Sequence, residues 1–240
     1  MSRERNQQSE SNPMPIVPPR KGGSVRNHVV ITGTGRAGTT FLVELLTKCG
    51  CNTGYTSERV GALKDPIARA GLETDIRKIH APYIVKSPWF CDHAAEVLSR
   101  DDIAMDHVLI PVRDVREAAG SRQYVQARQL ALLSLRARLS LFFRPRPLTG
   151  GLWHARNRWQ QEAVLQVKLY NLIHALSGSQ IPVTLLHYPR LIEDSRFLYE
   201  KIAFLLHGMG YPEFEQVFRR TARRELVHRF ADDVTASPLE

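Results

Sequence analysis

The feature that most constrains this chain is the segment HVVITGTGRAGTTFL at residues 28–42. Its apolar run, glycines and following apolar residues predict a buried strand, a tight turn and the first turn of a helix. Backbone N–H groups converge at such a turn, and the positive end of the helix dipole adds to their attraction for anions. The segment therefore predicts a binding site for a phosphate or sulfate group.

This loop departs from the nucleotide-binding pattern G-x-x-x-x-G-K-[ST] at one position. Gly33 and Gly38 have the required spacing, but Thr39 stands where a lysine would reach the β- and γ-phosphates. The nearest cation is Arg36, two residues before the second glycine. We therefore expect the loop to bind an anion with a different arrangement of charge from that of a kinase.

Strands and helices alternate along the rest of the chain. Apolar runs predict strands at about residues 28–32, 83–85, 107–112 and 183–188. Helical spacing predicts helices at about residues 38–48, 93–98, 158–176 and 197–206 and another that begins near Val115. The apolar residues of the stretch 130–150 fit both the spacing of a helix and the two-residue period of a strand. This order predicts a three-layer α/β fold of the P-loop NTPase-like type, with a central, mostly parallel sheet covered by helices on both faces.

The length of 240 residues is enough for one α/β domain with a substantial core, which we expect at residues 28–230. We expect residues 1–27 to form a disordered basic and polar arm and residues 231–240 to form a flexible tail. The arm lacks the apolar segment of a signal peptide or membrane anchor, and the three cysteines match no disulfide or zinc pattern. We therefore expect a cytoplasmic protein.

The net charge of +9 is unevenly distributed. Residues 118–161 contain eight arginines and no acidic residue, which is typical of a solvated face or an interaction surface. No DNA- or RNA-binding motif accompanies this charge. An anionic cofactor or an acidic substrate accounts for it at least as well as nucleic acid.

Cations follow several of the predicted strands. The carboxyl ends of parallel strands meet at one edge of a sheet, so we expect the glycine-rich loop, Lys86 and Arg113 to share one rim. Ser121 follows Arg113 by eight residues, about two helical turns. An arginine and a hydroxyl so placed can bind a second phosphate at a nucleoside's length from the first.

Three motifs resemble, in the same order, those of sulfotransferases that use 3′-phosphoadenosine 5′-phosphosulfate (PAPS). Residues 36–42, RAGTTFL, resemble the loop that binds the 5′-phosphosulfate in this family. Residues 113–121, RDVREAAGS, are similar to its 3′-phosphate motif, and residues 185–194, LLHYPRLIED, to a later strand and turn. The resemblance covers roughly residues 28–60, 83–122 and 183–219.

The resemblance implies transfer of a sulfuryl group from PAPS to a hydroxyl of a small-molecule, glycan or lipid acceptor, without a metal. Arg36 corresponds to a lysine in many members and to an arginine in the tyrosylprotein sulfotransferases, and it would neutralise charge on the bridging oxygen. The residues implied to bind the nucleotide are Gly35, Arg36, Ala37, Gly38, Thr39, Thr40, Phe41, Arg113 and Ser121.

A base must take the proton of the acceptor hydroxyl. Many cytosolic members have a histidine shortly after the lysine of the second strand, but residues 86–89 are KSPW here. The tyrosylprotein enzymes have a glutamate about twenty residues after the loop arginine, and Glu58 matches that spacing. Glu58 is therefore the first candidate base, with His93 and His80 behind it, and Lys86 is the candidate contact to the sulfate or the acceptor.

Simpler interpretations of these residues stay open. Glu58 and Lys86 also fit solvated surface charges, and Arg113 fits a salt bridge to Asp114 or Glu117. The C-terminal region departs from the family, because the sequence RRTARR at residues 219–224 replaces an Arg-Lys-Gly loop that closes over the nucleotide.

Two other functions fit parts of the sequence. A P-loop small-molecule kinase would use ATP and Mg²⁺ with Asp114 as a metal ligand, although the missing loop lysine disfavours it. A non-catalytic module that binds polyanions would use the arginines, although it leaves the glycine-rich loop unexplained.

Apolar side chains are candidates for the wall of an acceptor site. Residues 130–143, Trp153 and Trp159 fit such a wall, which suggests an apolar or aromatic alcohol or a glycolipid, and they fit a core equally well. We interpret His187, on an apolar strand, as a buried, hydrogen-bonded histidine.

Overall fold

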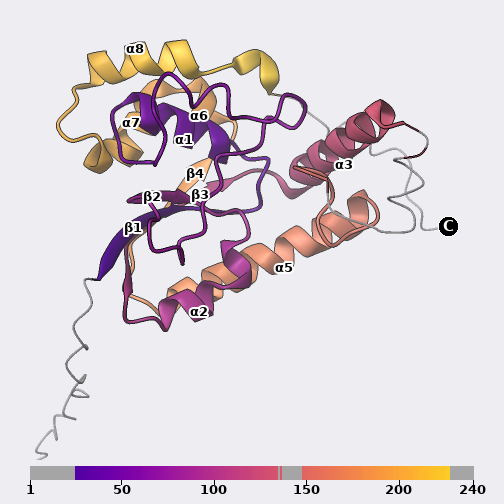
Figure 1. Ribbon diagram of the computed structural model, residues 1–240, viewed down its shortest axis with the longest axis horizontal. Coiled ribbons are helices and arrows are strands. Elements are labelled where there is room, and N and C mark those ends of the chain that lie inside the picture. Colours follow the sequence, from indigo (N-terminus) through magenta and orange to yellow (C-terminus); the bar gives the residue numbers. More distant parts are fainter. Residues whose placement is uncertain (1–24, 135, 137–147, 228–240) are drawn as a thin grey trace, which may run out of the picture.

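The computed structural model describes residues 25–134, 136 and 148–227, and a four-stranded parallel sheet lies at its centre (Figure 1). The spatial order of the strands is β2-β1-β3-β4. Their bounds are β1 (Arg26–Ile31), β2 (Ile84–Lys86), β3 (Ile103–Val112) and β4 (Val183–His187). Because all four strands run in the same direction, their carboxyl ends meet at one edge of the sheet.

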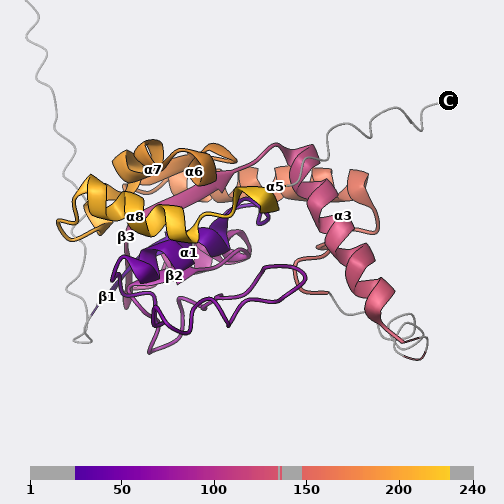
Figure 2. The same cartoon turned by 90° about the horizontal axis from the view of Figure 1, so that it is seen from above.

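Helices cover both faces of this sheet (Figure 1). One face carries α1 (Thr39–Lys48), α6 (Arg190–Glu193), α7 (Ser195–Ile202) and α8 (Tyr211–Thr221). The other face carries α2 (Ala94–Leu98) and α5 (Arg158–Ser177). The helix α3 (Val115–Leu132) starts at the end of β3 and packs against α5 (Figure 2). Three 3-10 turns are η1 (Phe90–Asp92), η2 (Ala203–Leu205) and η3 (Arg224–Leu226).

Buried apolar side chains form one large cluster on each face of the sheet. The alternation along β1 explains this, since Val29 and Ile31 join the cluster under α1, α7 and α8, while Val30 joins the cluster under α2 and α5. Each such buried side chain contributes about 1.5–3 kcal/mol. The two clusters therefore hold β1 and α1 firmly, and with them the glycine-rich loop that connects the strand to the helix.

The predicted α/β fold with helices on both faces is confirmed, and the described sheet is entirely parallel. The prediction placed the start of β3 near residue 107, but the strand begins at Ile103, where partly buried residues and the exposed Asp106 replace the continuous apolar run of its second half. The strand β1 begins at Arg26, so the predicted arm overlaps it by two residues. The helix α8 was not predicted.

Several predicted segments lie outside the described residues. They are residues 1–24 of the predicted arm, the predicted tail 231–240, and residues 135 and 137–147 of the stretch 130–150, whose pattern fits both a helix and a strand. Of that stretch, α3 covers the part up to Leu132. In the described part of the chain, no helix combines the length and apolar character needed to cross a membrane.

Candidate functional site

A cavity of about 710 Å³ opens at the carboxyl ends of the strands. Lys86 and every residue predicted to bind the nucleotide except Ala37 line it. The loop after β1, Lys86 at the end of β2 and Arg113 after β3 do share one rim, as predicted, and Tyr188 after β4 joins them. The parallel topology therefore gathers these side chains from four separate parts of the sequence.

The backbone of the glycine-rich loop has an unusual conformation. Gly33, Gly35 and Gly38 all have positive φ, and Gly38 occupies the N-cap position of α1. No described side chain caps this helix, so its first N–H groups and its dipole can serve a ligand in the cavity. At Gly35 a Cβ atom would lie 2.7 Å from a terminal nitrogen of Arg122, so only glycine fits without displacing that arginine.

Arg36 joins three parts of the site. Its Nε donates a hydrogen bond of 3.1 Å to Ser121 Oγ on α3, and its guanidinium also donates to the Ala68 carbonyl. The residue has a φ of 56°, a left-handed conformation that is rare outside glycine and that clusters at functional sites. Burial and the neighbouring Arg113 lower the pKa of Arg36. The contact with Ser121 is much closer than the nucleoside's length expected between the two phosphate-binding groups.

Arg113 is buried at the end of β3. One terminal nitrogen donates to the Arg36 carbonyl at 3.0 Å, and the other forms a 2.8 Å salt bridge with Glu117. The guanidinium also lies over the ring of Tyr188, 4.7 Å from its centroid. Asp114 caps α3 by accepting a 3.0 Å hydrogen bond from the Glu117 N–H. The salt-bridge interpretation is therefore correct for Glu117.

Arg122 is a site residue that the sequence analysis missed. It donates to the Thr34 carbonyl at 2.7 Å and to the Gly151 carbonyl at 2.9 Å, while its Nε is buried and has no partner among the described residues. Its guanidinium also lies 5.7 Å from the ring centroid of Trp153. Burial, together with Arg36, lowers the pKa of Arg122 to about 10. Its position beside Ser121 was a signal, but the many arginines of this region obscured it.

Lys86 is buried at the end of β2, with 2% of its surface exposed, so the surface-charge interpretation of this residue is wrong. Its Nζ donates to Thr40 Oγ1 at 2.7 Å, to the Gly71 carbonyl at 2.6 Å and to Glu73 Oε1 at 2.8 Å. Burial is the main cause that lowers the pKa of Lys86. Glu73 lines the cavity, and no motif in the sequence pointed to it.

The predicted bases do not line the cavity. Glu58 is exposed on the surface, and hydrogen bonds with its own N–H and with Thr56 lower its pKa. His80 and His93 also lie outside the residues that line the cavity. The interpretation of His187 as buried is wrong, because its strand β4 forms the edge of the described sheet and leaves this side chain exposed.

The remaining walls come from segments outside the predicted motifs. Trp153, which precedes α5, lines the cavity. Trp159 lies on α5, is exposed and does not line the cavity. Of the C-terminal arginine-rich stretch, Thr221 and Arg223 line the cavity. The region of residues 130–143 that we predicted as an acceptor wall lies largely outside the described residues.

Positive charge dominates the cavity. Among the described residues that line it, eight are arginine or lysine and two, Glu44 and Glu73, are acidic.

No protein-family model matches the chain, and no curated protein matches it either. The chemistry of this cavity is therefore the basis for inferring a function.

Proposed function

We propose that this chain is a sulfotransferase that uses PAPS as its sulfuryl donor and a hydroxyl compound as its acceptor. The observation that carries the proposal is the convergence of Arg36, Arg113 and Arg122 beside the glycine-rich loop. Within the described chain only Arg113 of these three forms a salt bridge. Buried cations are costly unless an anion compensates them, so a ligand with several negative charges is expected here.

The residues present fit such a ligand. The buried Nε of Arg122 has no partner in the described chain, and the N-terminus of α1 has no side-chain cap. The volume of about 710 Å³ lies within the range of about 300–1,000 Å³ that is usual for ligand pockets. The passage from β1 through a glycine-rich loop to α1 also supports the finer assignment of the fold as P-loop NTPase-like.

The motifs assign roles to the binding residues. The loop amides, Thr39, Thr40 and Arg36 would hold the 5′-phosphosulfate, and Arg113 with Ser121 would hold the 3′-phosphate. These two roles require the 3.1 Å hydrogen bond between Arg36 and Ser121 to open when the nucleotide binds. PAPS supplies the sulfuryl group, whose bond to the phosphate breaks as its bond to the acceptor oxygen forms. Arg36 then stabilises the negative charge left on the phosphate, and such electrostatic stabilisation provides much of the rate enhancement.

Glu73 is the base in this proposal, in place of Glu58. Glu73 lines the cavity, and a 2.8 Å hydrogen bond from Lys86 orients its carboxylate. Glu58 has the spacing expected from the tyrosylprotein enzymes but is exposed outside the cavity. A base must lie within hydrogen-bonding reach of the proton that it takes, so its position favours Glu73.

Two features favour this function over a kinase. Thr39 occupies the position of the lysine on which P-loop kinases depend. Asp114, which would hold Mg²⁺ in a kinase, already accepts the capping hydrogen bond of α3. ATP with Mg²⁺ is nevertheless the informative competitor for a binding test.

Calorimetric titration with adenosine 3′,5′-bisphosphate, the nucleotide product, tests the proposal. We expect micromolar binding that is the same with and without Mg²⁺, and much weaker binding of ATP. Preference for ATP with Mg²⁺ would replace the proposal with the kinase. Binding of neither nucleotide would leave only a polyanion-binding role, which heparin affinity that falls steeply with salt would reveal.

A further inference from the structure

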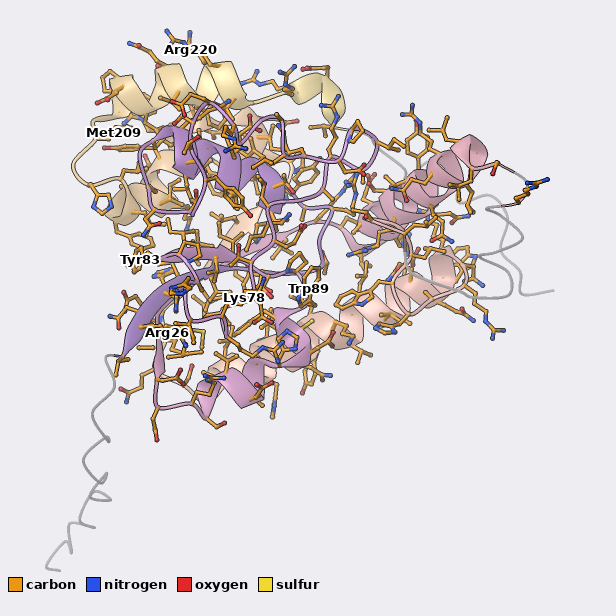
Figure 3. All side chains as sticks on the ribbon, in the orientation of Figure 1. Arg26, Lys78, Tyr83, Trp89, Met209 and Arg220 are labelled. Carbon is orange, nitrogen blue, oxygen red and sulfur yellow. The ribbon has the colours of Figure 1, made fainter. Side chains whose placement is uncertain are left out.

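Part of the cavity wall comes from segments that belong to none of the three sulfotransferase-like motifs. These segments are residues 64–73, residues 88–89 after β2, the C-terminal half of α3 and residues 148–153. They present large apolar side chains to the cavity, namely Ile67, Trp89, Tyr124, Leu152 and Trp153. Trp89 lies between the sheet and α5 (Figure 3) and is 41% exposed although it is aromatic. Exposed aromatic side chains in a cavity are typical of a surface that binds a flat apolar ligand.

These walls are held in place by hydrogen bonds. Asp65 Oδ1 accepts from the N–H groups of Ile67 at 2.9 Å and Ala68 at 2.5 Å. Gln126 Oε1 accepts from the Leu152 N–H at 2.9 Å. The segments 64–73 and 148–153 meet where Ala68 approaches Gly150, since a Cβ on this glycine would be 3.0 Å from Ala68 Cβ. These contacts hold residues 64–73 and 148–153 against each other and against α3.

Two exposed arginines, Arg69 and Arg128, belong to the same walls. Within the described chain neither forms a salt bridge, in contrast to Lys64, which also lines the cavity and is paired with Glu44. Arg69 has a φ of 51°, so its backbone is held in a left-handed conformation. Arg128 lies over the ring of Tyr124, 5.7 Å from its centroid. The apolar wall thus carries two cations that no described carboxylate neutralises.

We propose that the acceptor is a small aromatic hydroxy compound that carries an anionic group, such as a hydroxyarene carboxylate. This inference rests on the sulfotransferase function proposed above. The ring lies against Trp89 and Tyr124, the anionic group meets Arg69 and Arg128, and the hydroxyl faces Glu73. The acceptor oxygen forms its bond to sulfur as the sulfur–oxygen bond of the donor breaks, and the hydroxyl proton passes to Glu73.

The size of the cavity supports a small acceptor. A volume of about 710 Å³ has to hold the nucleotide as well, which leaves space for a compound of one or two rings. The charge supports an anionic one, because the arginines of the loop are committed to the nucleotide and Arg69 and Arg128 are additional to them.

The test uses three probes on the full chain saturated with adenosine 3′,5′-bisphosphate: 6-hydroxy-2-naphthoate, the neutral 2-naphthol and the sugar alcohol sorbitol. Calorimetry should show binding of the hydroxynaphthoate about tenfold tighter than that of 2-naphthol, and no binding of sorbitol. The double variant Arg69→Gln/Arg128→Gln should lose this preference while binding the bisphosphate normally. The control Arg156→Gln, an exposed arginine outside the cavity, should keep it.

The outcomes separate this inference from the function on which it rests. If the bisphosphate does not bind, the proposed function fails first. If the bisphosphate binds but 2-naphthol binds as tightly as the hydroxynaphthoate, or the double variant keeps the preference, the anionic acceptor is wrong and the sulfotransferase stands. Tight binding of sorbitol alone would overturn the aromatic acceptor in the same way.

Discussion

Arg122 donates a 2.7 Å hydrogen bond to the carbonyl oxygen of Thr34, and this bond fixes the glycine-rich loop against α3. The second terminal nitrogen of the same guanidinium holds the Gly151 carbonyl at 2.9 Å. One buried side chain thus joins the proposed nucleotide loop to the segment that forms part of the proposed acceptor wall.

Replacing Arg122 should weaken both the fold and the site. In Arg122→Met the Thr34 and Gly151 carbonyls lose their donor, which should cost about 1–3 kcal/mol of unfolding free energy. Bisphosphate affinity should fall at least tenfold, because a cation of the anion site is also lost. Arg122→Lys keeps the charge but cannot make both hydrogen bonds. Its stability and its bisphosphate affinity should therefore lie between those of the wild type and those of Arg122→Met. Urea unfolding and calorimetry measure these effects, and wild-type affinity in Arg122→Met would remove this residue from the site.

Arg36→Ala should weaken bisphosphate binding by about 1.5–3 kcal/mol, since charge-assisted hydrogen bonds to a phosphate are lost. The matched control is Arg219→Ala, because this arginine is 75% exposed on α8 and pairs only with Glu215 among the described residues. Calorimetry of both variants at the same ionic strength makes the comparison. Equal losses in the two variants would mean that the protein attracts the nucleotide through its general charge rather than through the loop.

Glu73→Gln should lower the turnover of PAPS and acceptor by about 10²–10⁴-fold, the usual loss for a general base. Glutamine can still accept the hydrogen bond from Lys86, so bisphosphate binding should change little. Glu58→Gln serves as the control and should keep full activity, because this side chain is exposed outside the cavity. Steady-state kinetics of the two variants make the comparison. Full activity in Glu73→Gln together with a large loss in Glu58→Gln would restore Glu58 as the base.

Gly150→Ala should destabilise the protein more than Gly50→Ala. Both glycines have positive φ, so alanine strains the backbone by about 1–2 kcal/mol at either position. The added Cβ meets nothing within 4 Å at Gly50, but lies 3.0 Å from Ala68 Cβ at Gly150. Thermal unfolding should show the extra loss, and only Gly150→Ala should weaken acceptor binding. Identical behaviour of the two variants would show that the contact with Ala68 is unimportant.

Asp75 should stabilise the fold above pH 4 and lose this effect in acid. Its two carboxylate oxygens accept hydrogen bonds from Arg77 at 3.0 and 2.7 Å, and these bonds lower the pKa of Asp75 to about 2. A carboxyl with a lower pKa in the folded state contributes stability that disappears as the pH falls from about 4 towards 2.

Asp75→Asn should therefore cost about 1 kcal/mol at pH 7, since the pair is partly solvated, and progressively less below pH 4. The control is Asp101→Asn, an exposed carboxylate outside the salt bridges of the described chain, which should show no such trend. Urea unfolding from pH 2 to 7 measures both, and a constant difference for Asp75→Asn would contradict the assignment.

Local patterns explain what could be predicted from the sequence. The spacing of Gly33 and Gly38 and the apolar residues on either side are properties of one short segment, and the strand, loop and helix followed from them. The rim shared by the loop, Lys86 and Arg113 followed from a general rule, because parallel strands end at one edge of the sheet. The prediction of His187 as buried failed because burial depends on which strand lies at the edge, and strand order is not a local property.

The sequence by itself determined the α/β architecture and the position of the glycine-rich loop, because helix and strand periods and the conformational freedom of glycine act over a few residues. Only the tertiary structure decided which carboxylate meets Lys86 and which arginine braces the loop. Glu73 comes from a segment without a period or motif, and Arg122 reaches back 88 residues to the Thr34 carbonyl. Such pairs form when the packed core brings distant segments together, and no local pattern in the sequence predicts them.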